Sequence, residues 1–322
     1  MSLFVTNITA ANSGPLLLNG DEPAAPETPA TQPEETTQAP QSEQSAAEPG
    51  PVPTPQRIPN LGHALLFVSF AGLLLILLEI VLTLMGKAPA TVEKGVIALQ
   101  HPKLQIATMA ATYLVTLTAA WVFYPTLWRR KFLDGLQWHW ATARSQANRL
   151  IALGFVLGVM MQIVTYFITP PKTMPIDTFF LTPMNAWLIT LFGTIVAPVF
   201  EEICFRGFLV PAFAITYDWL SLPRTDEART RWQTTTALTP LSLIFSAVLS
   251  SLCFALMHAQ QVAHLWAALL GLFSISLVLT FVRVKTQSVA ASTLVHSAYN
   301  SFVFLTVFIA TGGYRHLDRM TH

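Results

Sequence analysis

Residues 201–206 (EEICFR) place three ionisable side chains within six residues, inside an apolar run that extends over residues 187–215. A charged side chain costs roughly 2.5–3.5 kcal/mol at the centre of a membrane helix on insertion scales, so a chain that keeps three of them together usually uses them. The polar groups that can pair with these charges lie downstream, in other apolar runs: His258, His296 and Asn300.

The spacing of these residues predicts how they face one another. Glu202 and Arg206 are four residues apart with the glutamate on the N-terminal side, which is the better order for a helical ion pair, so both are interpreted as structural support. Glu201 lies about 100° round the helix and is free to face another group. His296 and Asn300 are also four residues apart and therefore share one helix face.

One carboxylate, two imidazoles and an amide in a water-poor pocket suit the hydrolysis of a peptide bond. A glutamate can take a proton from water, and a histidine can orient that water or donate to the leaving amine. An asparagine N–H, together with a second histidine, can stabilise the oxyanion of a tetrahedral intermediate. Glu201, His258 and His296 would also suit Zn²⁺, although the chain contains no His-Glu-x-x-His helix.

The elements that must position these groups are apolar and long. The chain has 322 residues, 52% of them apolar and 11% charged, against a usual charged share of about 25%. Runs long enough to span a bilayer predict an all-α polytopic membrane protein, a bundle of about seven to eight helices around a polar cavity. The expected spans are 61–85, 104–124, 150–168, 184–220, 239–258, 262–282 and 288–310. The net charge of +1 does not indicate nucleic-acid binding.

Two stretches need a separate interpretation. Residues 184–220 are too long for one straight span, and Pro198 and Pro211 are expected to kink or divide them. Pro198 leaves the carbonyl of Thr194 without its helical donor, which can open the helix near Glu201. Residues 132–148 mix aromatic and polar side chains and predict one interfacial helix lying on the membrane.

The chain divides into two predicted regions. Residues 1–60 are acidic and rich in proline, which predicts a disordered tail, and residues 61–322 form the transmembrane domain. Basic residues favour an orientation with the N-terminus inside. Counted from that side at about 1.5 Å per residue, Glu201, His258 and His296 differ in depth by roughly a dozen Å, which tilt can absorb. We therefore expect the three helices to present them at one level.

Three ordered motifs carry a resemblance to a known family: Glu201-Glu202-x-x-x-Arg206, Phe254-x-x-x-His258 and His296-x-x-x-Asn300. They resemble those of the CPBP family of intramembrane proteases, which includes the Ras-converting type of CAAX prenyl endopeptidase and lysostaphin-resistance-A-like proteins. The resemblance covers about residues 185–305, the expected protease core. It implies that Glu201 activates the catalytic water with His258 as its partner, and that His296 and Asn300 form the oxyanion hole.

The resemblance leaves the substrate and the metal open. The expected partner is a membrane-associated protein or peptide, with a prenylated CAAX-type C-terminus or another membrane or leader segment. Family members are often described as metalloproteases, and a metal-free glutamate mechanism fits these residues as well. Two alternatives remain: a non-catalytic immunity or scaffold protein of the same fold, and a proton-coupled carrier. The expected location is the inner membrane of a bacterium or the endoplasmic reticulum of a eukaryote.

Overall fold

The structure is a computed structural model that describes residues 56–87, 90–93, 96–99, 101–167 and 175–320. Most of the predicted tail at residues 1–60 lies outside these residues. Seven helices are long and apolar enough to cross a membrane. They are α1 (Leu61–Leu84), α2 (Pro102–Trp128), α5 (Ala147–Tyr166), the continuous stretch Pro183–Leu220, α10 (Pro240–Met257), α11 (Trp266–Thr286) and α12 (Val289–Ala310).

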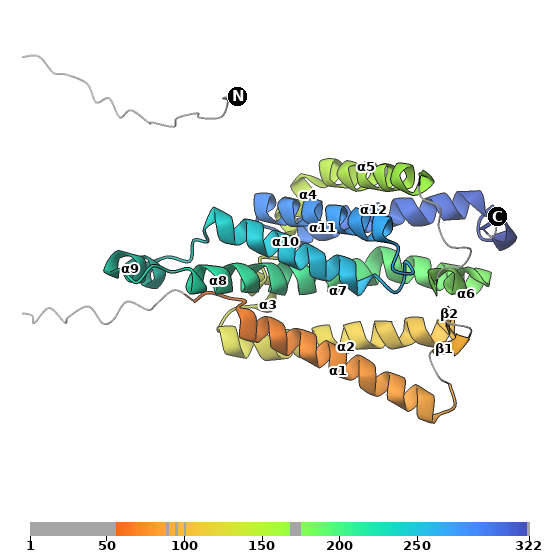
Figure 1. The fold of residues 1–322 in the computed structure, drawn as a ribbon, viewed down its shortest axis with the longest axis horizontal. Coiled ribbons are helices and arrows are strands. Elements are labelled where there is room, and N and C mark those ends of the chain that lie inside the picture. The colour runs from red at the N-terminus through yellow and green to blue at the C-terminus, as the bar shows by residue number, and fades with distance from the viewer. Residues whose placement is uncertain (1–55, 88–89, 94–95, 100, 168–174, 321–322) are drawn as a thin grey trace, which may run out of the picture. The chain divides into compact units, whose positions relative to one another are not determined.

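These helices confirm the predicted fold class, and the chain is a multi-pass integral membrane protein (Figure 1). Their outer faces carry exposed apolar side chains such as Leu73, Ile76 and Val122, which lipid can cover. Several helices begin where the sequence supplies a capping side chain. Thr239 accepts from the backbone N–H of Ser242 at the start of α10, and Ser288 caps α12 in the same way.

The stretch Pro183–Leu220 stays one continuous helix but contains two π-helical segments. It runs through α6 (Pro183–Leu191), a π-helical segment (Phe192–Val196), α7 (Ala197–Glu202), a second π-helical segment (Ile203–Leu209) and α8 (Val210–Leu220). Pro198 and Pro211 each stand second in the α-helix that follows a π segment. The helix therefore continues past both prolines, and each proline marks a change from π to α winding. Single π turns inside α-helices are common near functional sites.

Residues 132–148 differ from the prediction of one interfacial helix. They form two short helices, α3 (Phe132–Gly135) and α4 (Trp140–Ser145), separated by Gln137 in the left-handed conformation at φ 57°. Phe132 and Leu136 are 3% and 1% exposed, because they pack against the aromatic core rather than against lipid. The segment therefore closes one end of the bundle.

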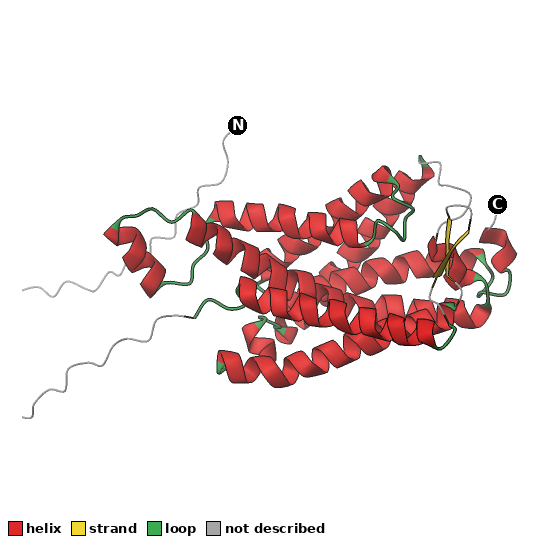
Figure 2. Ribbon diagram, turned by 60° about the horizontal axis from the view of Figure 1, so that its bottom comes forward, coloured by secondary structure: helices red, strands yellow, loops and turns green. Residues whose placement is uncertain are grey.

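Smaller elements lie at both ends of the bundle. A two-stranded antiparallel hairpin, β1 (Ala90–Glu93) and β2 (Val96–Leu99), pairs Ala90 with Leu99. It lies at the end of the bundle opposite to the short helix α9 (Asp226–Thr234) (Figure 2). Two 3₁₀ turns, Pro175–Phe180 and Leu317–Met320, complete the described elements.

Close packing between α5 and α12 fixes the position of the last motif. Gly154 of α5 lies so near α12 that a Cβ atom there would approach the carbonyl oxygen of Val295 to 2.5 Å and the Cβ of Ala298 to 2.6 Å. Small residues at such crossings let membrane helices approach each other closely. Val295 precedes His296, so this contact holds the backbone that carries the histidine.

Candidate active site

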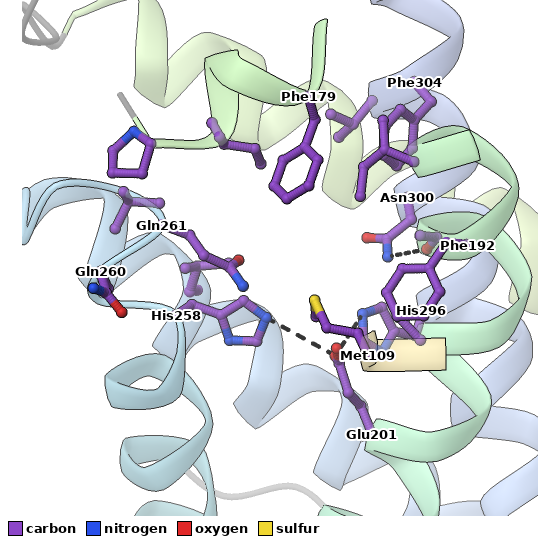
Figure 3. Close-up of a pocket in the computed structure, with 18 of the residues that line it drawn as sticks. Met109, Phe179, Phe192, Glu201, His258, Gln260, Gln261, His296, Asn300 and Phe304 are labelled. Carbon is purple, nitrogen blue, oxygen red and sulfur yellow. Dashed lines mark hydrogen bonds and ion pairs between the residues drawn. The ribbon is translucent and has the colours of Figure 1, made fainter. Parts of the chain in front are cut away.

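A cavity of about 430 Å³ lies among the helices, and all four predicted catalytic residues line it (Figure 3). Glu201 comes from α7, His258 from the C-terminal end of α10, and His296 and Asn300 from α12. Glu201 is 7% exposed and His296 is 4% exposed. Helices that are distant in sequence therefore bring these side chains to one level, despite the difference in depth expected for straight helices.

Glu201 faces both imidazoles with one oxygen atom. Its Oε2 lies 3.9 Å from Nε2 of His258 and 3.8 Å from Nε2 of His296. These separations are too long for direct hydrogen bonds. A single small polar group can contact the carboxylate and an imidazole together at such spacing. Oε2 of Glu201 and the two Nε2 atoms thus form a polar cluster at the wall of the cavity, as Figure 3 shows.

The other nitrogen of each histidine is held by an acceptor. Nδ1 of His258 lies 2.9 Å from the carbonyl oxygen of Phe254, one turn earlier in α10. Nδ1 of His296 lies 2.9 Å from Oε1 of Glu202. Because both acceptors lack a hydrogen to donate when Glu202 is ionised, Nδ1 carries the hydrogen in both rings. Both Nε2 atoms are then directed toward Glu201 with fixed ring orientations.

Glu202 and Arg206 form an ion pair with no exposed surface. Nη1 of Arg206 donates to Oε1 of Glu202 over 2.7 Å, and both side chains are 0% exposed. Nη2 of Arg206 donates to the carbonyl oxygen and the hydroxyl of Ser276 on α11, at 2.8 and 2.7 Å. The same Oε1 atom that accepts from Arg206 also contacts His296, so this pair links three helices beneath the cavity.

Asn300 is positioned by the π segment before α7. The N–H of Ala197 bonds the carbonyl of Phe192, five residues back, so it does not serve Gly193 as in a regular α-helix. Pro198 has no N–H to offer in its place. The carbonyl oxygen of Gly193 instead accepts from Nδ2 of Asn300 over 2.7 Å. This bond leaves the second N–H of Asn300 available to the cavity that the side chain lines.

The alternative of a zinc site does not fit the donor geometry. Tetrahedral zinc with bonds of about 2.0–2.1 Å places its ligand atoms roughly 3.3–3.4 Å apart. The Glu201 oxygen is 3.8–3.9 Å from both imidazole nitrogens. Among the described residues, no group of three or more His, Cys, Asp or Glu side chains is arranged to hold a metal ion.

Several contacts of the site were not predicted from the sequence. The sequence assigned Glu202 to Arg206 alone and did not indicate its bond to His296. The serine that anchors Arg206, Ser276, stands in an apolar run where nothing marks it out. The role of Gly193 had one usable signal, a glycine five residues before Pro198, which is the spacing at which a π turn loses its donor.

Comparison with known proteins gives one match. Residues 183–302 match the family described as Type II CAAX prenyl endopeptidase Rce1-like. A comparison with curated proteins found no match, and neither did a comparison with solved structures. The matched range includes all three motifs, from Glu201 to Asn300, and extends from the start of α6 into α12. Over residues 183–302 the chain is therefore similar to the Rce1-like family of type II CAAX prenyl endopeptidases.

Proposed function

We propose that this protein is an intramembrane endopeptidase in which Glu201 activates water. The observation that carries the proposal is the convergence of Glu201 Oε2 and two oriented imidazole Nε2 atoms, within 3.9 Å, on the wall of a cavity between membrane helices. The family match over residues 183–302 supports a protease of the CAAX type. The substrate is a peptide of a membrane-associated protein.

The reaction consumes one water molecule and moves one proton twice, from water to Glu201 and from Glu201 to the leaving nitrogen. Glu201 takes a proton from water, and the water oxygen forms a bond with the peptide carbonyl carbon. Nε2 of His258 accepts a hydrogen bond from the second O–H of that water, which keeps its hydrogen, and so orients its attack. When the C–N bond breaks, the proton held by Glu201 passes to the leaving nitrogen. The products are a carboxylic acid and an amine, and the enzyme returns to its starting state.

The oxyanion is stabilised from the α12 side of the cavity. The second Nδ2–H of Asn300 is directed by the bond that the first makes to Gly193. His296 donates from Nε2 when it carries both protons, because its Nδ1–H is already engaged by Glu202. Fixed donors of this kind stabilise the oxyanion more strongly when they need little reorganisation during the reaction. The Glu202–Arg206 pair supplies that rigidity for His296.

The test is cleavage by purified protein in liposomes. Substrates are a fluorogenic prenylated CAAX peptide, its unprenylated form and a mixed peptide library read by mass spectrometry. We expect Glu201→Gln to lower the cleavage rate roughly 100-fold or more, which is the scale of a lost general base. Glu227→Gln, which removes an exposed carboxylate from α9, is the matched control and should retain full activity.

Other outcomes would contradict the proposed mechanism or favour one of the two alternative functions. Activity that is retained in Glu201→Gln would contradict the assigned base. Activity that is lost on adding a chelator and restored by Zn²⁺ would contradict the metal-free mechanism, whereas we expect cleavage to continue in chelator. Folded wild-type protein that cleaves none of the substrates would favour the scaffold, and proton-linked flux in the same liposomes would favour the carrier.

A further inference from the structure

Tyr113, in the middle of α2, lies outside the matched residues 183–302 but packs against the helix that carries Glu201. Its ring is stacked on that of Phe200, the residue directly before Glu201, with ring centroids 3.8 Å apart and planes 3° from parallel. Aromatic pairs usually have centroids about 4.5–7 Å apart, so this contact is very close. The ring of Tyr113 also stacks with that of Phe192, at 5.5 Å and 29°. One side chain of α2 therefore touches this helix at two places.

The two rings that Tyr113 contacts are separated by a change in winding. Phe192 begins the π segment Phe192–Val196, and Phe200 lies in α7, which follows it. In a regular α-helix, side chains eight positions apart point about 80° away from each other, because each residue adds about 100°. A π turn takes up about one of those residues, which reduces the difference to roughly 20°. The π winding therefore brings both rings to the face that packs against α2.

Each of these two contacts lies next to a group of the candidate site. Phe200 is followed by Glu201, so the direction of its ring and the direction of the carboxylate are set by the same turn of helix. Phe192 is followed by Gly193, whose carbonyl oxygen accepts from Asn300 because the π turn has withdrawn its helical donor. A contact that favours the π winding therefore keeps both the base and the oxyanion donor in place.

Tyr113 lies behind the wall of the cavity. Met109, one turn earlier on α2, lines the cavity near Glu201 (Figure 3), whereas Tyr113 is not among the described residues that line it. On its other side, Phe200 packs against Phe67 of α1, with ring centroids 5.6 Å apart. Tyr113 can therefore act on the site through the rings it packs against, and not by touching a substrate.

We propose that Tyr113 is a positioning residue for the cleavage reaction: its ring holds the π winding ahead of Glu201 by packing against Phe192 and Phe200 together. The effect on cleavage rests on the proposed function, but the effect on the helix can be measured without any substrate. The flat ring makes both contacts, so the hydroxyl group is dispensable. The inference adds α2 to the parts of the chain that the reaction needs.

The first test is the structure of the Tyr113→Leu protein in nanodiscs, determined by electron cryomicroscopy with a bound antibody fragment. Leucine fills part of the space but cannot stack. We expect the N–H of Ala197 to leave the carbonyl of Phe192 and to bond that of Gly193, as in a regular α-helix. Asn300 should then lose its bond to Gly193.

The matched control is Tyr217→Leu. Tyr217 of α8 stacks with Phe245 of α10 at 4.9 Å and 35°, and neither residue lines the cavity. The same replacement therefore breaks an aromatic contact of the same kind between two helices, away from the first π segment. We expect this variant to keep the π winding and the cleavage rate, even if its unfolding temperature falls as far as that of Tyr113→Leu.

The second test is cleavage in liposomes, at a temperature well below the unfolding of each variant. We expect Tyr113→Leu to lower kcat at least about tenfold and to leave KM within about twofold, because small misplacements of reacting groups are costly. Tyr113→Phe keeps the ring and should keep kcat. Phe200→Leu removes the same contact from the other side, so the double variant should be no slower than the slower single variant.

The contrary outcomes are distinct. A π turn that persists in both Tyr113→Leu and Phe200→Leu would overturn the inference, and the second variant decides if the first does not fold. A normal kcat in Tyr113→Leu would overturn the positioning role, and a low kcat in Tyr113→Phe would assign the effect to the hydroxyl instead of the ring. An altered π turn in a protein whose wild type cleaves none of the substrates would support the inference about the helix and overturn the proposed function alone.

Discussion

One oxygen atom of Glu202 accepts from two partners, Arg206 on its own helix and His296 on α12. Replacing the carboxylate by an amide leaves the charge of Arg206 unbalanced at 0% exposure, with the neutral amide oxygen and Ser276 as its acceptors. Removing one member of a buried pair usually costs about 3–5 kcal/mol. It also offers an N–H or a weaker acceptor to His296 where an anion had fixed its ring.

We therefore expect Glu202→Gln to unfold at a clearly lower temperature in detergent and to lose most cleavage activity. Asp226→Asn is the matched control, because it breaks the exposed Arg229–Asp226 pair at 3.7 Å and should change neither measurement. An unchanged unfolding temperature in Glu202→Gln would show that the pair does not support the fold. Loss of activity with retained stability would confine its role to His296.

At this scale the sequence predicted residue types better than contacts. Glu201, His258, His296 and Asn300 were found because polar groups in membrane helices are rare, and that rarity is visible in one dimension. The bond from Asn300 to Gly193 was not, because it depends on a shift of backbone hydrogen bonds by one residue. A shared acceptor such as Glu202 likewise requires knowing which helices are neighbours.

Among the helices, the crossing of α5 and α12 is the contact that places the third motif. At Gly154, an added methyl group would meet backbone atoms of α12, the Val295 carbonyl at 2.5 Å and the Tyr299 nitrogen at 2.9 Å. Backbone cannot rotate away as a side chain can. The two helices must separate, and His296 must move with α12.

Gly154→Ala should therefore lower the stability by about 1–3 kcal/mol, the usual cost of overpacking, and reduce cleavage. Gly72→Ala, in α1, is the matched control, since no atom lies within 4 Å of the added methyl group and alanine favours helix. Thermal unfolding in detergent and the cleavage rate measure both effects. Equal stability of the two variants would indicate that α5 and α12 can separate without strain.

The spans were predictable because each combines length with apolar composition, and the start of α12 follows its capping serine. The region at 132–148 was not, because its aromatic residues suit a membrane surface and a protein core equally well. Only the neighbouring helices decide that Phe132 and Leu136 turn inward. The sequence predicted that Pro198 and Pro211 disturb the helix, but it did not predict the π winding that precedes each of them.

In the whole molecule, every residue of the candidate site belongs to one compact unit, Pro53–His322. We expect a protein lacking residues 1–52 to insert, to keep its unfolding temperature within error and to retain its cleavage rate on a short peptide. Size-exclusion chromatography, thermal unfolding and the liposome assay measure these properties. A large loss of the cleavage rate with normal stability would assign the removed segment a part in substrate capture.

The fold class was accessible from composition alone, because a chain with 11% charged residues and repeated apolar runs has few ways to fold other than as a helix bundle in a membrane. The arrangement of the helices was not accessible, since the runs look alike. Family likeness adds information only over residues 183–302. The position of α1 against α2 and α8 comes from the structure.

A π segment contains one residue more than a regular helix needs at that place. The stretch Phe192–Val196 thus acts as a built-in insertion just ahead of the two carboxylates. Because the π turn takes up that extra residue, deleting Ile195 would regularise the winding, preserve a membrane-spanning helix and leave Glu201 and Glu202 pointing nearly as before. Winding the same residues as a regular α-helix, with none deleted, would instead turn both carboxylates relative to α6 by most of the roughly 100° that one residue adds. The direction in which the carboxylates point therefore depends on the π winding of one helix.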